Sequence, residues 1–156
     1  MNKVDLGLSV LWGEYNLGAD NIESPGRLFT WYDAVKEING LDLAGQKLGK
    51  GWRLPTYAEV EELLCNRFQP LFLSNGVGLK GLIVYGRNGN IIFLPSNSKG
   101  LDVIVPRNAN YWTSSLDEDD PNQASQFRFD MNGVYGGCNK KDYGQFIRPV
   151  FDKNLL

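Results

Sequence analysis

Two Asn-Gly dipeptides, each placed between two apolar runs, constrain the fold of this chain more than any other feature. Asn88-Gly89 lies within GLIVYGRNGNIIFLP, and Asn132-Gly133 lies within QFRFDMNGVYGG. Asn-Gly in this setting is the strongest short-range signal for a β-hairpin, because the favoured two-residue turn needs a positive φ at both central positions. In the second segment apolar and polar residues alternate, which predicts one buried and one wet face. The apolar positions are Phe127, Phe129 and Met131, and the polar ones are Gln126, Arg128 and Asp130.

The first half of the chain predicts two amphipathic helices. In TWYDAVKEING, Thr30 is a suitable N-cap, apolar residues recur at helical spacing as far as Ile38, and a glycine suits the exit. In GWRLPTYAEVEELL, Thr56 as N-cap and Glu59 three residues later form a capping box. The apolar stripe of this second helix is expected to extend to Phe68.

Strands are predicted at both ends of the chain. Residues 4–12 give the opening strand, with Gly7 as a weak point, and QFIRPVF gives the closing one. In the closing strand Pro149 favours an edge position or a strand terminus. The order is one strand, two helices and then several antiparallel strands with long loops, so the predicted fold class is α+β. No linker divides the chain, and residues 1–156 are expected to form a single domain.

Composition excludes several classes of function. The net charge is −2 and the pI is about 5.1, whereas a general nucleic-acid binder normally shows a basic face, so no nucleic-acid partner is expected. No run approaches the roughly 20 apolar residues that a membrane span needs. The N-terminal MNKVDLGLSV lacks the apolar region of a signal peptide. Either the protein stays inside the cell or a leader has been removed.

The chain contains no histidine, which removes the commonest general base, metal ligand and activator of nucleophiles. Ser114 and Ser115 are therefore not expected to act as nucleophiles. Cys65 and Cys138 supply too few soft ligands for a zinc site and too few sulfurs for a disulfide framework. We expect two separate thiols, buried or half-buried.

The acidic run LDEDDPNQ is a candidate calcium site, and no other cofactor is expected. Oxygen ligands of the kind that Ca²⁺ prefers come from Asp117, Glu118, Asp119, Asp120 and Asn122. Charge runs are usually solvated loops, and this alternative stays open.

The segment from Tyr135 to Tyr143 is predicted to be a polar loop between two strands. Tyrosine is amphipathic and orders at low entropic cost, so it suits a binding surface. The alternative is a connecting loop with incidental tyrosines. Together with the acidic run and the preceding strand, this segment supplies the residues that we expect to contact a ligand. They are Asp117, Asp119, Asp120, Asn122, Gln126, Arg128, Tyr135, Asn139, Lys140, Asp142 and Tyr143.

Several segments, in order along the chain, resemble known families. VDLGLSVLWGEYNLGA is similar to the opening of the Fibrobacter succinogenes major paralogous domain family. TWYDAVKEINGLDLAG and GWRLPTYAEVEELL are similar to the related Lcl C-terminal-domain-like family, and GRNGNIIFLP, YWTSS and YGQFIRPV match the rest of the pattern. The resemblance implies a C-type lectin-like fold, in which two helices flank a small, mainly antiparallel sheet with paired terminal strands and long loops. It also implies a surface or secreted bacterial protein. The name of the fold does not by itself imply that a sugar is bound, so function must be argued from the site.

The WRLPT element also resembles a segment of the formylglycine-generating enzymes, which share this fold. Because the element recurs in enzymes and in non-enzymes, the resemblance implies an architectural role rather than a catalytic one. Trp52 is then expected to fill core, and Arg53 to make an ion pair or bind backbone carbonyls. Tyr111 and Trp112 of YWTSS are expected in the core and a turn. The full set of expected structural residues is Trp52, Arg53, Thr56, Glu59, Trp112 and Arg148.

No enzymatic activity is expected. An oxidase of the formylglycine-generating type needs a reactive cysteine pair late in the chain, where only Cys138 lies, and the related sulfoxide-forming enzymes bind iron through histidines. We predict a non-enzymatic module that recognises a protein or glycan partner through loops in residues 116–145. The alternatives are an oxidase-like enzyme and a structural domain of a surface assembly that contacts its partner through a strand edge.

A further alternative is a binding protein diversified by a retroelement. Variable proteins of diversity-generating retroelements also resemble this fold, and their variable tract would correspond to residues 111–150. In that mechanism AAC codons become NNC codons, which never encode Lys, Gln, Glu, Met or Trp. The positions that such codons reach are Asp117, Asp119, Asp120, Asn122, Ser125, Tyr135, Asn139, Asp142 and Tyr143. The positions that must stay fixed are Gln126, Lys140, Lys141 and Gln145.

Overall fold

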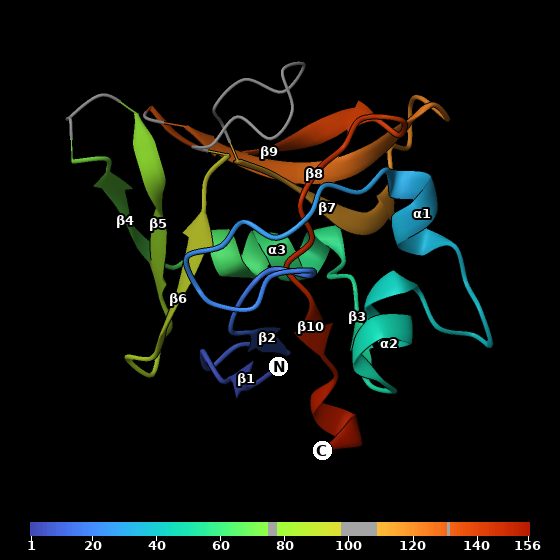
Figure 1. Cartoon of the computed structure of the whole chain (residues 1–156), viewed down its shortest axis with the longest axis horizontal. Coiled ribbons are helices and arrows are strands. Elements are labelled where there is room, and N and C mark those ends of the chain that lie inside the picture. Colours follow the sequence, from blue (N-terminus) through green and yellow to red (C-terminus); the bar gives the residue numbers. More distant parts are fainter. Residues whose placement is uncertain (75–77, 98–108, 131) are drawn as a thin grey trace.

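The computed structural model describes residues 1–74, 78–97, 109–130 and 132–156, and it shows a mixed α+β fold of short helices and three antiparallel sheets (Figure 1). The terminal sheet has the order β1-β2-β10-β3, and Val150 of β10 pairs with Trp12 of β2. The predicted pairing of the two ends of the chain is therefore confirmed. The strands are β1 (Lys3–Val4), β2 (Leu11–Gly13), β3 (Trp52–Arg53) and β10 (Val150–Phe151), and a 3-10 helix follows at Lys153–Leu155.

The opening segment differs from the single strand predicted over residues 4–12. It forms two short strands, β1 and β2, which pair with each other in antiparallel orientation. The chain turns between them because Gly7 has a φ of 73°, a conformation that breaks an extended backbone. Leu6 and Leu8 still point into the core, at 0% and 4% exposure, so the apolar alternation serves burial without strand pairing.

The first predicted helix is shorter than expected. α1 spans Trp31–Val35 and is capped by Thr30, whose hydroxyl accepts from the Asp33 amide. It ends because Lys36 adopts an extended conformation, and Ile38 instead bridges to Leu41 in a tight turn that contains Gly40 with a φ of 75°. Ile38 is 53% exposed, so its assignment to the buried helical face was wrong.

Sequence reasoning missed one helix and overextended another. α2 spans Leu43–Leu48 and is capped by Asp42, a signal that the sequence contains. α3 spans Tyr57–Leu64 and has the predicted capping box between Thr56 and Glu59. Its buried positions are Val60 and Leu63, whereas Phe68 lies in the next strand at 40% exposure and is not part of the helical stripe.

Both predicted hairpins are present. The second sheet has the order β4-β5-β6, and Asn88-Gly89 lies in the turn between β5 and β6. The third sheet has the order β7-β8-β9, and Asn132-Gly133 lies at the turn between β8 and β9; Met131 lies outside the described residues. The strands are β4 (Arg67–Phe72), β5 (Leu79–Tyr85), β6 (Ile91–Pro95), β7 (Ala109–Leu116), β8 (Gln123–Asp130) and β9 (Gly133–Lys140).

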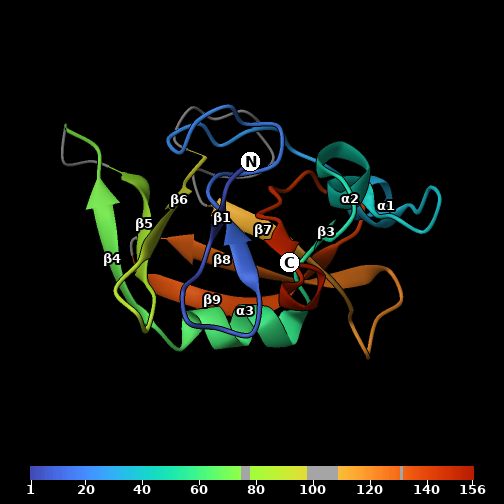
Figure 2. The same ribbon diagram turned by 90° about the horizontal axis from the view of Figure 1, so that it is seen from below.

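The core lies between the three sheets, and α3 packs against the sheet of β7, β8 and β9 (Figure 2). Tyr111 is its centre: the ring stacks on Phe127 at 4.9 Å between centroids, and the hydroxyl donates to the Pro95 carbonyl. Burial raises the pKa of Tyr111 to about 12. The opposite face of β8 is only partly wet: Arg128 and Asp130 are half-buried, whereas Gln126 is buried at 6% exposure, contrary to the prediction. Tyr111 and Trp112 are fully buried, as expected, but they lie in β7 rather than a turn.

The closing segment is mostly extended without being a strand. Only Val150 and Phe151 form β10, which lies inside the terminal sheet. Pro149 therefore lies at a strand terminus, one of the two predicted alternatives, but it precedes the strand instead of lying near its end. Arg148 is fully buried, and its guanidinium donates to the side chain of Asn16 and to the carbonyls of Gly13 and Phe93. It thereby links the N-terminal segment, β6 and the end of the chain.

Candidate recognition surface

The predicted ligand-contact residues gather along the third sheet, but the segment 135–143 is not the expected loop. Tyr135 to Lys140 lie in β9 and pair with β8, where Arg128 is opposite Tyr135 and Ala124 is opposite Asn139. Only residues 141–144 connect β9 to the closing segment. The glycines favour a turn locally, but the partner strand β8 supplies the pairing that makes the segment a strand.

β9 is exposed over four consecutive residues, Tyr135 to Cys138. It lies at the edge of its sheet, and two of these four residues are glycines. A Cβ at Gly136 would lie 2.1 Å from the Tyr57 hydroxyl of α3, so a side chain there would require the Tyr57 side chain to move. A Cβ at Gly137 would meet nothing within 4 Å. The middle of β9 therefore presents bare backbone.

The loop between β7 and β8 forms an acidic hollow beside β9, with a volume of about 430 Å³. We call it the acidic hollow, and its principal lining residues are Tyr57, Asp117, Glu118, Asp119, Gly137 and Cys138. Among the residues that the structure describes, no Lys or Arg side chain lines it. Burial raises the pKa of the Cys138 thiol, and the charges of Asp117 and Asp119 raise it further. The hollow thus has a negative potential.

A second hollow of about 410 Å³ lies on the other side of the same loop. It is lined by Tyr32, Asp120, Asn122, Gln123, Lys140 and Asp142. Of the predicted contact residues, six thus line one of the two hollows: Asp117, Asp119, Asp120, Asn122, Lys140 and Asp142. Tyr57 and Tyr32 were missed, because each comes from a helix distant in sequence and looked like an ordinary first-turn residue.

The other predicted contact residues have partners within the sheet or are buried. The Arg128 guanidinium lies over the Tyr135 ring at 4.9 Å, and the Asn139 amide donates to Gln145 at 3.0 Å. The Tyr143 ring faces the Lys140 ammonium at 5.9 Å. Gln126 lies beneath this surface, and its Oε1 has no hydrogen-bond partner among the described residues. It is placed to support the surface rather than to touch a ligand.

The acidic run does not converge as a calcium site. Asp117 accepts from the Asp119 amide and Asp120 from the Asn122 amide, so these carboxylates close turns in their own loop. Within the described ranges, no group of three or more His, Cys, Asp or Glu side chains is arranged to hold a metal ion. The geometry favours the solvated-loop interpretation.

Cys65 and Cys138 are both free. The expectation of two separate thiols is confirmed, but both are exposed rather than buried. Cys65 is the C-cap residue of α3, and Cys138 lies on the open edge strand, so neither reaches the core.

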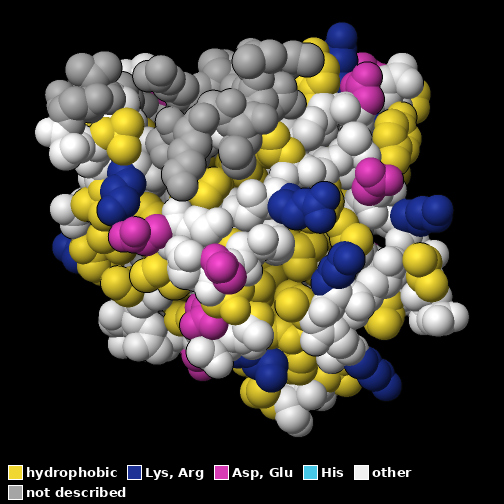
Figure 3. Space-filling view, viewed as in Figure 1, with side chains coloured by type: hydrophobic (Ala, Val, Ile, Leu, Met, Phe, Trp, Pro, Cys, Tyr) yellow, Lys and Arg dark blue, Asp and Glu magenta, His cyan; other side chains and the backbone are white. Residues whose placement is uncertain are grey.

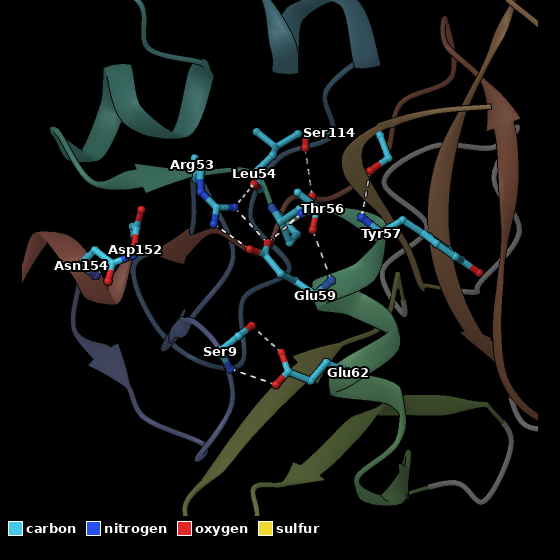
Figure 4. A network of polar contacts seen from close by, with 12 residues as sticks. Ser9, Arg53, Leu54, Thr56, Tyr57, Glu59, Glu62, Ser114, Asp152 and Asn154 are labelled. Atoms are coloured by element: carbon cyan, nitrogen blue, oxygen red, sulfur yellow. Dashed lines mark hydrogen bonds and ion pairs between the residues drawn. The ribbon is translucent and has the colours of Figure 1, made fainter. Parts of the chain in front are cut away.

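The WRLPT element forms a closed polar network (Figure 4). Arg53 donates to both carboxylate oxygens of Glu59, at 2.6 and 2.9 Å, and to the Leu54 carbonyl. Glu59 also accepts from the Thr56 amide. The hydrogen bonds that Arg53 donates to Glu59 raise the pKa of Arg53. Trp52 packs with Leu11 and Phe151 in a small core cluster. The side chains of Arg53 and Thr56 thus help to start α3 and join it to the terminal sheet.

Removing the N-cap hydroxyl of α3 is expected to destabilise the protein measurably. Thr56→Ala should lower the free energy of unfolding by about 1 kcal/mol, because the Glu59 amide loses its acceptor. Urea denaturation followed by circular dichroism measures the change. Thr56→Ser keeps the acceptor and is the matched control; an equal loss in both variants would contradict a capping role.

No family model, curated protein or solved structure matches this chain. No helix among the described residues is long and apolar enough to cross a membrane. On the face shown in Figure 3, Lys and Arg side chains are scattered among acidic ones and form no continuous basic patch.

Proposed function

We propose that this chain is a non-enzymatic recognition module with a C-type lectin-like fold, which binds a protein or glycan at the surface formed by β9 and the loop 117–122. The paired terminal strands, the helices beside an antiparallel sheet and the family resemblance support the fold. One observation carries the function: two hollows flank a polar loop, next to an edge strand with an exposed tyrosine. Such a combination of concavity, aromatic contact area and polar rim is typical of binding surfaces.

The scaffold holds this surface in place while the polar groups make contact. β8 pairs with β9 along its full length in the same sheet. The Lys141 ammonium donates to the Pro121 carbonyl, and this hydrogen bond connects the acidic loop to the end of β9. A rigid support lowers the entropic cost of binding. Cys138 lies on this recognition surface, and its thiol is poorly suited to nucleophilic chemistry, because its raised pKa keeps it protonated near neutral pH. We further propose a location at the cell surface or outside the cell.

A second candidate is the retroelement-diversified binder, and burial favours it. Three of the four positions that must stay fixed are buried, with exposures of 6%, 9% and 0% for Gln126, Lys141 and Gln145. Of the positions that NNC codons reach, all except Ser125 are exposed or half-buried. A diversified protein needs this division between a fixed frame and a free surface. Sequencing codons 105–150 across a population tests it: clustered changes at the reachable positions support diversification, and a uniform sequence removes this candidate.

The recognition surface can be tested with tyrosine variants. Binders are first selected from a random peptide library and a glycan array against the intact protein. Replacing Tyr135 and Tyr143 together by Ala should weaken the selected ligands at least tenfold, because truncated aromatic anchors typically cost 2 kcal/mol or more. Phe72→Ala is the matched control, since Phe72 is an exposed aromatic residue on β4, in a different sheet. Unchanged affinity in the double variant would place the binding site elsewhere.

A further inference from the structure

β9 lacks the features that normally protect an edge strand. Exposed edges are usually shortened, bulged, covered or blocked with Pro or Lys, because their free N–H and C=O groups can pair with another chain. β9 has eight residues, pairs with β8 without a register shift and is exposed at its centre. Among the described residues no strand pairs with its other edge, and its only basic residue is Lys140 at the end.

The two glycines make this edge accessible from outside. Gly136 and Gly137 carry no side chain, so an incoming backbone can approach β9 closely there. The acidic hollow opens at the same point, because Gly137 and Cys138 form part of its lining. A strand that pairs with β9 would therefore place side chains in or above the hollow.

The lining of the hollow determines which side chain fits. Three acidic residues, Asp117, Glu118 and Asp119, line the hollow, and no Lys or Arg in the described part of the chain lines it. Tyr57 adds an aromatic ring, and aromatic rings attract cations. Charge complementarity thus selects the long basic side chains, whose apolar stems can lie along the hollow while the charge meets the carboxylates.

We propose that an extended segment of a partner protein pairs with the open edge of β9 and inserts a Lys or Arg side chain into the acidic hollow. This inference rests on the proposed function and specifies its partner. Side chains alternate along a strand, so residues next to the basic one point to the opposite face, where Tyr135 lies. The partner segment therefore has a basic residue flanked by apolar ones. Main-chain pairing supplies affinity, and the hollow supplies specificity.

Short synthetic peptides test both components. The probe is acetyl-Thr-Val-Lys-Val-Thr-amide, titrated into the ¹⁵N-labelled protein up to about 5 mM, a range that suits millimolar Kd values. We expect saturable shifts of backbone amides in residues 133–140 and 117–119. Replacing Lys by Glu should weaken binding at least tenfold. Methylating the three central amide nitrogens should do the same, because it removes the donors that pair with β9.

Protein variants assign the charge contribution. The double variant Asp117→Asn, Asp119→Asn keeps the side-chain acceptors of the loop and should bind the Lys peptide at least fivefold more weakly. A control peptide in which norleucine replaces Lys should bind this variant and the unaltered protein equally. The matched control is Asp33→Asn with Glu37→Gln, two exposed acids on and after α1. The proposal would be overturned if the Lys and Glu peptides bound with equal affinity, or if the methylated Lys peptide bound as tightly as the unmethylated one. The absence of shifts at 133–140, or a dimer through β9 seen by sedimentation, would also overturn it.

The outcomes also separate this inference from the proposed function. If library-selected ligands lose affinity in the tyrosine double variant while methylated peptides bind as well as the unmethylated one, the surface recognises ligands but not by strand pairing. If ligands bind and neither the tyrosines nor the acidic residues affect them, both proposals fail together.

Discussion

Replacing Arg148 by Ala is expected to lower the free energy of unfolding by about 4 kcal/mol, one of the largest effects in the chain. Arg148 is fully buried, and its guanidinium satisfies Asn16 and the carbonyls of Gly13 and Phe93. The variant leaves these acceptors without donors, at about 1–3 kcal/mol for each buried group. It also leaves a cavity where the side chain packed.

An opposing effect makes the outcome informative. Burial lowers the pKa of Arg148 to about 10. The desolvation of the charged guanidinium therefore offsets part of the stabilisation that its hydrogen bonds contribute. Arg148→Met removes that charge while filling most of the space, and we expect a smaller loss of about 2 kcal/mol. Urea denaturation with linear extrapolation measures both variants. Arg87→Ala, at an exposed turn position, is the control. A loss below 1 kcal/mol for Arg148→Ala would show that the orphaned acceptors find other donors.

Replacing Trp112 by Ala is the second large expected effect, at about 3–5 kcal/mol. Trp112 has no exposed surface and packs in a cluster with residues of α1, α2, β8 and the closing segment. Its indole N–H donates to the Phe29 carbonyl at 2.8 Å, which joins β7 to the start of α1. Losing the ring therefore creates a cavity and loosens the support beneath the acidic loop.

The conservative variant separates packing from hydrogen bonding. Trp112→Phe keeps most of the ring volume but leaves the Phe29 carbonyl without its donor, so we expect a loss of about 1–2 kcal/mol. Thermal unfolding followed by circular dichroism ranks the variants. Equal losses for Ala and Phe would mean that the hydrogen bond, rather than ring packing, dominates at this position.

Local signals predicted those parts of the fold that short segments decide. The capping box at Thr56 and Glu59 and the two Asn-Gly turns need only a few neighbouring residues, and the structure has all three. Asp42 was an equally local signal for α2. The helix that it caps is short, so its apolar residues were not recognised as a helical pattern separate from that of α1.

The errors lie where distant contacts override local preference. Gly136 and Gly137 favour a turn by themselves, yet eight pairings with β8 make residues 133–140 a strand. Gln126 fits a wet face by alternation but is buried beside its register partner Trp112, which packs in a cluster with residues of α1 and α2. The predicted contact residues in 116–145 do gather along the third sheet, but the segment 135–140 is a strand rather than a loop, and that this surface binds a ligand stays a prediction. The participation of Tyr57 depends on how α3 packs beneath the third sheet, which no neighbouring residue in the sequence indicates.

The pairing of β2 with β10 also determines where β9 lies relative to the two ends of the chain. The chain enters and leaves at one pole of the molecule, and β9 lies at the opposite pole (Figure 1). Anything joined to either end therefore sits away from β9, and grafting several copies onto one polymer would point every β9 edge outward. Under the recognition function that we propose, such an array would contact a repetitive target at many weak sites at once, so useful avidity would require only modest affinity from each copy.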